Sequence, residues 1–409
     1  MAKTPGLLPR RAALKMLDAV LRRGETLEQA GGAANSLPAH SDRALARALA
    51  GEVLRWLVDI DALIDSATRD VLPADAKARM LLRIMLAGWL RLGTPPHAVV
   101  ATALPLLAGG PKRLAHGVYA TLSRQGASLP DQPTLPTEVA ARWGERTLAI
   151  ATGLALPPPL DLTVRDPTKT GEWAGRLDAV SLLPGHLRLV RGGNVAELPG
   201  YEEGAWWVQD LAASLPARLL GEGEGRRVLD LAAAPGGKTM QLAAAGWDVT
   251  ALDMHPGRMM RLRENLARTR LDAHTVIADA LEWEPDAPFD AVLLDAPCTA
   301  TGTCRRHPDV LHRIALRHIE EMADLQRRLL HRAAGWVKTG GRLVYATCSL
   351  EESEGEGVAA SCPLATDPIS ADGLPAEVAV SDDGWLRTDP GMLRDAGGMD
   401  GFFIARFAA

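Results

Sequence analysis

Apolar residues in the first 128 positions recur every three or four residues, which is the period of an amphipathic α-helix. The runs span residues 14–21, 45–64, 81–90 and 112–126. Gly24 follows the first run as a stop signal, and Gly93 ends the third. Ser41 precedes the second run, and we expect it to be the N-cap because serine can accept hydrogen bonds from free N–H groups in a first helical turn. The pattern predicts an all-α bundle over residues 1–128.

The next part of the chain is less regular. Three prolines in the stretch ASLPDQPTLPT predict a linker at 127–137. Residues 138–210 begin with a helical pattern and continue with two strand-like runs, LDLTV at 160–164 and HLRLV at 186–190. This part is therefore expected to be a small mixed α+β segment.

From residue 226 onward, short apolar runs alternate with helical patterns. The expected strands are 227–231, 248–253, 274–279, 290–295 and 342–347, and the longest helical pattern between them is 315–338. Such alternation predicts a parallel, Rossmann-like sheet with helices on both faces. Four of the five runs contain or end in aspartate, and ligands of such sheets bind at the carboxyl ends of the strands. The aspartates should therefore line one crevice of an α/β domain at 211–409.

The first of these strands leads into the sequence VLDLAAAPGGKT at 228–239. A P-loop would require glycine at position 232, which is alanine, and the dinucleotide pattern G-x-G-x-x-G is absent. What remains is a turn whose glycines permit a ligand to approach the backbone beside a helix N-terminus.

This turn and the following strand ends suit S-adenosylmethionine, which carries a ribose and an adenine but no phosphate. Asp253 is placed to bind the ribose hydroxyls, and Asp279 could accept a hydrogen bond from the adenine amino group. The alternative is an ordinary strand–helix turn. The expected cofactor-binding residues of the turn are Ala232, Ala233, Ala234, Pro235, Gly236, Gly237 and Lys238.

Charge is distributed unevenly along an otherwise ordinary composition. The 409 residues are 47% apolar and 23% charged, with a net charge of −5. Residues 1–128 contain 17 Lys and Arg against 10 Asp and Glu, a net of +7, so the remainder carries −12. A basic first third on an acidic body suggests a local anionic partner, RNA or DNA, although a solvated helical surface would give the same count.

Cysteine use and hydropathy indicate where the protein works. Four cysteines in a chain of this size are too few for a disulfide framework and are typical of a reducing compartment. Arg10, Arg11 and Lys15 interrupt any signal-like apolar stretch. No uncharged apolar run approaches the roughly 20 residues that span a bilayer. We expect a cytoplasmic protein without a membrane partner.

Several motifs together resemble the Sun family of RNA cytosine-5 methyltransferases, most closely the bacterial 16S ribosomal RNA methyltransferase B type. The matching motifs are AAAPGGKT at 232–239, DAPCTATG at 295–302 with RRHPD after it, YATCS at 345–349 and DGFF at 400–403. VQD at 208–210 resembles the start of the family's catalytic domain, and the first 100 residues resemble its fused, NusB-like RNA-binding domain.

The resemblance implies a role for each cysteine. A thiolate added at carbon 6 of cytosine activates carbon 5 towards a methyl donor, and the bond must be broken after transfer. By the family pattern Cys348 is the nucleophile, and Cys298 assists proton removal and product release. Asp295 would hold the base beside the methyl donor. The implied substrate is a flipped-out cytosine in RNA, with 16S rRNA as the expected RNA. The helical domain and the 138–210 segment would bind this RNA, and the enzyme is expected to be a monomer.

Other readings stay open at this point. One alternative is a DNA cytosine methylase, in which the cysteine of the Pro-Cys pair attacks the base; Cys298 would then be the nucleophile. A tRNA methylase is a second alternative. A third is an RNA-binding antitermination factor whose methylase domain is inactive. Cys304 departs from the family pattern, and its spacing from Cys298 and His307 could suit a metal ion, but no second close pair of ligands follows, so we expect no metal site. A redox pair of Cys298 and Cys304 is the other alternative. Arg305 and Arg306 could touch the RNA backbone or lie in an exposed basic turn.

Overall fold

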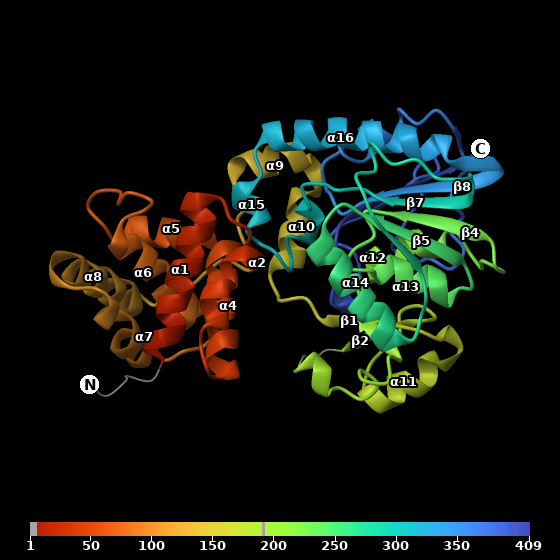
Figure 1. Cartoon of the computed structure of the whole chain (residues 1–409). Coiled ribbons are helices and arrows are strands. Elements are labelled where there is room, and N and C mark those ends of the chain that lie inside the picture. Colours follow the sequence, from red (N-terminus) through yellow and green to blue (C-terminus); the bar gives the residue numbers. More distant parts are fainter. Residues whose placement is uncertain (1–5, 190–192) are drawn as a thin grey trace. The chain divides into compact units, whose positions relative to one another are not determined.

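The structure is a computed structural model that describes residues 6–189 and 193–409, and the chain divides into two compact units (Figure 1). One unit runs to Leu156 and also contains the segment Arg306–Ile314. The other contains Pro157–Arg305 and Ala315–Ala409. Each unit is described separately.

The first unit is helical in the part that the structure describes, which confirms the all-α fold predicted for residues 1–128. Its helices are α1 (Leu7–Arg23), α2 (Leu27–Ala30), α3 (Gly32–Asn35), α4 (His40–Arg55), α5 (Leu57–Ser66), α6 (Lys77–Leu90), α7 (Pro96–Ala103), α8 (Gly109–Gln125), α9 (Thr137–Trp143), α10 (Thr147–Leu154) and α15 (Val310–Arg313). Of these helices, α9, α10 and α15 lie outside the predicted range. Helix α6 is buried on every side from Ala78 to Gly88, so it forms the centre of the bundle. An apolar helix in that position gains stability from burial around its whole circumference.

Two local expectations for this unit are wrong. Helix α4 begins at His40 after Ala39, and no side chain caps it, so Ser41 lies inside the first turn. The run at 45–64 is two helices: α4 ends at Arg55 and α5 begins at Leu57, with the fully buried Trp56 between them. A long apolar period cannot reveal such a break when the residue at the break is itself apolar.

Many basic side chains of this unit are exposed, among them Lys112 and Arg113 on α8. Buried Arg83 instead donates to both oxygens of Asp61 at 2.8 and 2.7 Å, and the partly buried Arg91 donates to Glu52 at 2.9 Å. Both carboxylates are shared, since Asp61 also pairs with Arg79 and Glu52 with Arg55.

A small antiparallel sheet opens the second unit, with strand order β2-β1-β3. Its elements are β1 (Leu160–Val164), α11 (Thr170–Leu177), β2 (His186–Leu189) and β3 (Trp206–Val208). The first two strands were predicted; Val190, the last residue of the second predicted run, lies outside the described residues. Strand β3 was not predicted, because it has only three residues, two tryptophans and a valine.

The main sheet has the strand order β10-β11-β8-β7-β4-β5-β6. Its strands are β4 (Arg227–Leu231), β5 (Asp248–Asp253), β6 (His274–Ile277), β7 (Phe289–Asp295), β8 (Val337–Thr347), β9 (Ala365–Thr366), β10 (Leu386–Thr388) and β11 (Phe402–Ala408). Strands β4 to β8 are parallel, which confirms the predicted Rossmann-like core. Strands β10 and β11 are antiparallel and were not predicted.

Helices cover both faces of this sheet, as expected for parallel strands (Figure 1). The covering helices are α12 (Leu211–Arg218), α13 (Gly237–Ala244), α14 (Pro256–Thr269), α16 (Leu316–Gly335) and the short α17 (Glu356–Ala359). Alternate residues of β4 pack to opposite sides, with Val228 in the α12–α13 core and Leu229 in the α16 core. Across the described parts of both units, no helix is long and apolar enough to cross a bilayer.

Candidate active site

The turn between β4 and α13 is held in a conformation that its small residues make possible. Ala232 has φ 56° and Gly236 has φ 104°, both in the left-handed region. A Cβ on Gly236 would lie 2.9 Å from the Cγ of Leu262, so side chains are excluded there by both strain and space. The Thr239 hydroxyl donates to Asp230 at 2.6 Å and fixes the start of α13 to β4.

Beside this turn lies a pocket formed by the carboxyl ends of the strands. Its lining is mostly apolar: Leu231, Ala232, Leu252, Met254, Ala278, Ala280, Leu294, Pro297, Leu325 and Leu329, with the polar groups of Asp253, His255, Arg258 and Asp279. Apolar walls with a few polar groups are typical of small-molecule sites.

Asp253 is the buried acid of this pocket, with 2% of its surface exposed. Its oxygens accept backbone N–H bonds from His255 at 2.9 Å and Ala234 at 3.2 Å, and Arg258 lies 3.4 Å away. Because each carboxylate oxygen has two lone pairs, Asp253 can still accept from ligand hydroxyls. Asp279 is exposed and accepts from the N–H of Leu281 at 2.8 Å. Apolar walls and a buried carboxylate that can orient a ligand fit an adenosine-containing cofactor.

The residues of the glycine turn contact two different parts of the site. Ala232 lines the pocket with Asp253 and Asp279, whereas Lys238 points to the neighbouring strand end and donates to Asp295 at 2.8 Å. This lysine is buried and lies over the ring of Phe402, 5.2 Å from its centroid. Lys238 thus connects the turn to the end of β7, three residues before Cys298.

Cys298 and Cys348, fifty residues apart in sequence, are in contact. Strands β7 and β8 are parallel neighbours, with Asp295 opposite Ala346, so the loops that follow them start side by side. The two Sγ atoms are 3.4 Å apart. Both residues are partly exposed, at the edge of the sheet where the strands end.

The environment of Cys348 favours the neutral thiol. The hydrogen bond with Cys298, followed by burial and the nearby charge of Asp295, raises the pKa of Cys348 well above its ordinary value, while Lys238 opposes the shift. A thiolate is the reactive form. Cys348 would therefore have to lose its proton before it could act as a nucleophile.

The backbones of three motifs meet behind the cysteines. The N–H of Gly302 donates to the carbonyl of Cys348 at 2.9 Å, and the N–H of Gly401 donates to the carbonyl of Gly302 at 2.9 Å. A Cβ on Gly302 would lie 2.0 Å from the Gly401 oxygen. This close approach explains why glycine occurs in both DAPCTATG and DGFF.

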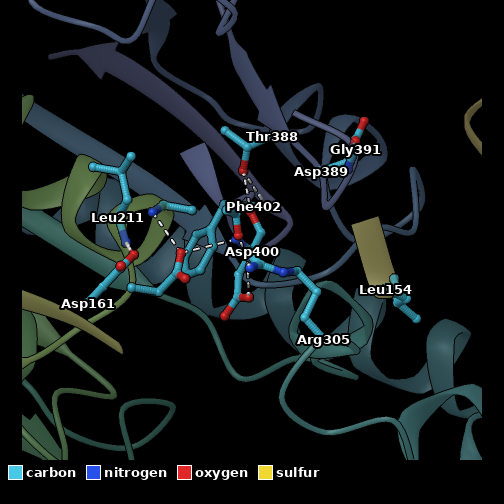
Figure 2. A network of polar contacts seen from close by, with 12 residues as sticks. Leu154, Asp161, Leu211, Arg305, Thr388, Asp389, Gly391, Asp400 and Phe402 are labelled. Carbon is cyan, nitrogen blue, oxygen red and sulfur yellow. Dashed lines mark hydrogen bonds and ion pairs between the residues drawn. The ribbon is translucent and has the colours of Figure 1, made fainter. Parts of the chain in front are cut away.

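A buried polar network joins these motifs to VQD (Figure 2). The N–H of Asp400 donates to Asp210 at 3.1 Å, and its carbonyl accepts from Thr388 at 2.9 Å. Arg305 lies 3.8 Å from the Asp400 carboxylate and is 1% exposed. Arg305 therefore belongs to the interior, and the predicted exposed turn or RNA contact is wrong for this residue.

Comparison with known proteins identifies the family. The family described as 16S rRNA methyltransferase RsmB/F matches residues 217–408, and the NusB family matches residues 8–108. A ribosomal RNA small subunit methyltransferase B from Xylella fastidiosa is 35% identical, with 98% of each chain covered. One from Pseudomonas putida is 33% identical, with 97% of this chain and 98% of the relative covered. The chain belongs to this methyltransferase B family.

A solved structure agrees with this assignment. A methyltransferase homologue from Pyrococcus horikoshii has a TM-score of 0.56 at 27% identity, covering 70% of this chain and 97% of its own. The predicted family, enzyme class and fold of an S-adenosylmethionine-dependent methyltransferase with a NusB domain are thereby confirmed.

Two buried acids near these motifs, Asp230 and Glu354, were given no individual role from the sequence. Burial raises the pKa of Asp230 to about 7, with added repulsion from Asp295 and Asp253. Glu354 is fully buried behind the cysteine loops. Asp230 could have been noticed because it stands in the strand before the glycine turn, but Glu354 is one of four glutamates in the stretch EESEGE, and nothing local distinguishes it.

The structure also bears on the motif containing Cys304. This side chain is fully buried, and the sulfur partner of Cys298 is Cys348. Within residues 6–189 and 193–409, no three His, Cys, Asp or Glu side chains are grouped so that they could hold a metal ion.

Proposed function

We propose that this protein transfers a methyl group from S-adenosylmethionine to carbon 5 of a cytosine in small-subunit ribosomal RNA. The observation that carries the proposal is the contact of Cys298 and Cys348 at the ends of adjacent strands, next to a pocket suited to an adenosine. The printed names of the relatives, ribosomal RNA small subunit methyltransferase B, support the substrate.

The cofactor would lie in the pocket at the ends of β4, β5 and β6. Asp253 would accept from the ribose hydroxyls, Asp279 from the adenine amino group, and the turn 232–238 would lie along the ligand. S-adenosylmethionine bound there supplies an electrophilic methyl group. The support for this placement is the buried, still accepting carboxylate of Asp253 among apolar walls.

The cysteines would make and then break one bond to the base. The Cys348 thiolate adds to carbon 6, which raises the electron density at carbon 5. After carbon 5 has gained the methyl group, Cys298 takes its proton, and the electrons left behind expel the Cys348 sulfur. Asp295, held by Lys238, would orient the pyrimidine through N3 and N4. The target must be unstacked, because a thiolate cannot reach carbon 6 within a helix.

The other parts of the chain would bind the RNA. We assign residues 1–128 as a NusB-like RNA-binding domain, 138–210 as a second RNA-binding segment and 211–409 as the catalytic domain. The positive surplus of residues 1–128 supports the first assignment, since lysine and arginine pair with phosphates. A monomer working in the cytoplasm would suit four cysteines that form no disulfide.

A direct test compares substrates for the purified protein. Labelled S-adenosylmethionine is incubated with naked small-subunit RNA, transfer RNA or duplex DNA, and 5-methylcytosine is mapped by sequencing. Label in small-subunit RNA at one position, which also loses its mark when the gene is deleted, is the expected result. Label in DNA or transfer RNA alone would replace the substrate, and cofactor binding without any transfer would favour an inactive RNA-binding factor.

A further inference from the structure

Glu354 places a carboxylate directly behind both cysteine loops, in the turn that follows β8. The group accepts four hydrogen bonds. Oε2 receives the backbone N–H of Thr299 and the side-chain amide of Gln326, each at 2.9 Å; Oε1 receives the hydroxyls of Thr299 and of Ser349, the latter at 2.8 Å. Four donors match the four lone-pair positions of an ionised carboxylate.

The donors are the immediate neighbours of the two cysteines. Thr299 follows Cys298, and Ser349 follows Cys348. One buried carboxylate therefore accepts hydrogen bonds from both chain segments, at the residue next to each cysteine. Hydrogen bonds from neutral donors to an ionised acceptor are among the stronger ones in proteins, so they should hold the two segments rigidly relative to each other.

This set of hydrogen bonds is itself anchored on two sides. Gln326, on α16, also donates to the carbonyl of Pro297 at 2.8 Å, and the Tyr345 hydroxyl donates to the carbonyl of Glu354 at 2.5 Å. Thr301 and Ser349 share a hydroxyl contact at 3.2 Å. Glu354, Gln326 and Ser349 all have exposed fractions of 0%, so water does not compete for these bonds.

We propose that Glu354 is a positioning residue that sets the separation and orientation of Cys298 and Cys348 for the methyl transfer. This proposal rests on the proposed function for its catalytic consequence. None of the three residues that donate to Glu354 lines the cofactor pocket, so we expect the main effect at the cysteines. Because Gln326 also holds the carbonyl of Pro297, which does line the pocket, cofactor affinity is measured alongside the rate.

The informative variant is Glu354→Gln, which preserves volume but puts an amide NH₂ where two donors need an acceptor. The matched control is Glu352→Gln, an exposed glutamate in the same turn. We expect Glu354→Gln to slow single-turnover methyl transfer by about 10–100-fold, since small misplacements of reacting groups have effects of that order. KM and Kd for S-adenosylmethionine should not change, and Glu352→Gln should behave as wild type.

A second measurement needs no RNA. Diamide, an azo oxidant, removes two electrons and two protons from a pair of thiols and leaves a disulfide. The rate at which the Cys298–Cys348 disulfide forms, followed by peptide mapping, reports how well the sulfurs are held together. We expect this rate to fall several-fold in Glu354→Gln and to be unchanged in Glu352→Gln.

The two measurements separate the two proposals. Wild-type rates of disulfide formation or of methyl transfer in Glu354→Gln would overturn the positioning role. So would a loss of cofactor affinity as large as the loss of rate, because that indicates general disruption. If the wild-type protein methylates no RNA while disulfide formation still depends on Glu354, the proposed function fails and the positioning role stands.

Discussion

The cofactor pocket and the cysteine pair lie at the same edge of one sheet, yet they are built in different ways. The pocket is lined by apolar side chains from strand ends and α16, with Asp253 as its buried acid. The cysteine loops are tied to each other through buried polar groups, including Glu354 and the Gly302–Cys348 backbone bond.

The difference follows from what each part has to do. A pocket that binds a nucleoside can tolerate small shifts, because apolar contact is not directional. Two thiols that make and break one bond to a base, as we propose for Cys298 and Cys348, would have to be held to within about half an ångström. The directional hydrogen bonds of the network lie where that proposed chemistry would need them.

The largest expected effect tests the cysteine side. Cys348→Ala should reduce methylation to background and form no covalent complex with RNA, because no other group replaces the thiolate at carbon 6. Gel analysis of labelled enzyme–RNA mixtures measures both. Cys362→Ala, a cysteine of the α16 core, is the control and should remain active. Residual turnover in Cys348→Ala would remove it as nucleophile.

Cys298→Ala should lose turnover in a different way. Attack and methyl transfer can proceed, but the carbon 5 proton stays, so a methylated enzyme–RNA adduct should accumulate and survive denaturing electrophoresis. The opposite pattern, an adduct only in Cys348→Ala, would exchange the two roles and indicate the mechanism of DNA cytosine methylases.

A smaller effect is expected on the pocket side. Asp253→Ala should weaken S-adenosylmethionine binding by about 1–3 kcal/mol, the worth of charge-assisted hydrogen bonds to ligand hydroxyls. Calorimetry measures the change, with exposed Asp272→Ala as control. Equal affinity in a folded Asp253→Ala protein would show that the ribose binds elsewhere.

The rate of methyl transfer should depend on pH through Cys348, whereas no such dependence is expected from the cofactor pocket. Because the pKa of Cys348 is raised, the thiolate fraction, and with it the transfer rate, should fall about tenfold for each pH unit below that pKa. The hydrogen bond to Cys298 is the largest cause, so adduct formation by Cys298→Ala should extend to lower pH than wild-type transfer does. A shift to higher pH would contradict the assigned cause.

The last prediction concerns Asp230 under the glycine turn, where we expect a change in stability and the smallest effect on activity. Its pKa of about 7 means that the folded protein holds this proton more tightly than the unfolded chain. Stability from the protonated form is present at low pH and is lost as pH rises to about 7, up to about 4 kcal/mol. Asp230→Asn, which stays neutral, should therefore gain Tm relative to wild type between pH 5 and pH 8. A constant difference in Tm would argue against the raised pKa.

Much of the catalytic unit could be predicted because its signals are local. Each parallel strand is a short apolar run, and a cysteine or an aspartate at the end of such a run must emerge at the ligand-binding edge. Cys298, Cys348 and Asp253 were found in this way, with the family resemblance supplying their expected roles. The antiparallel strands were missed because β10 has only three residues and the pairing of β11 with β8 is made by distant residues.

The sequence by itself determined the helical and α/β parts, the family, and which residues end the strands. Only the tertiary structure decided that Lys238 pairs with Asp295, that Arg305 is internal, and that Glu354 rather than Glu352 turns inward. The physical reason is that a charged side chain is buried only where distant segments supply its partners. Those partners, such as Thr299 and Gln326 for Glu354, come together only when the chain has folded.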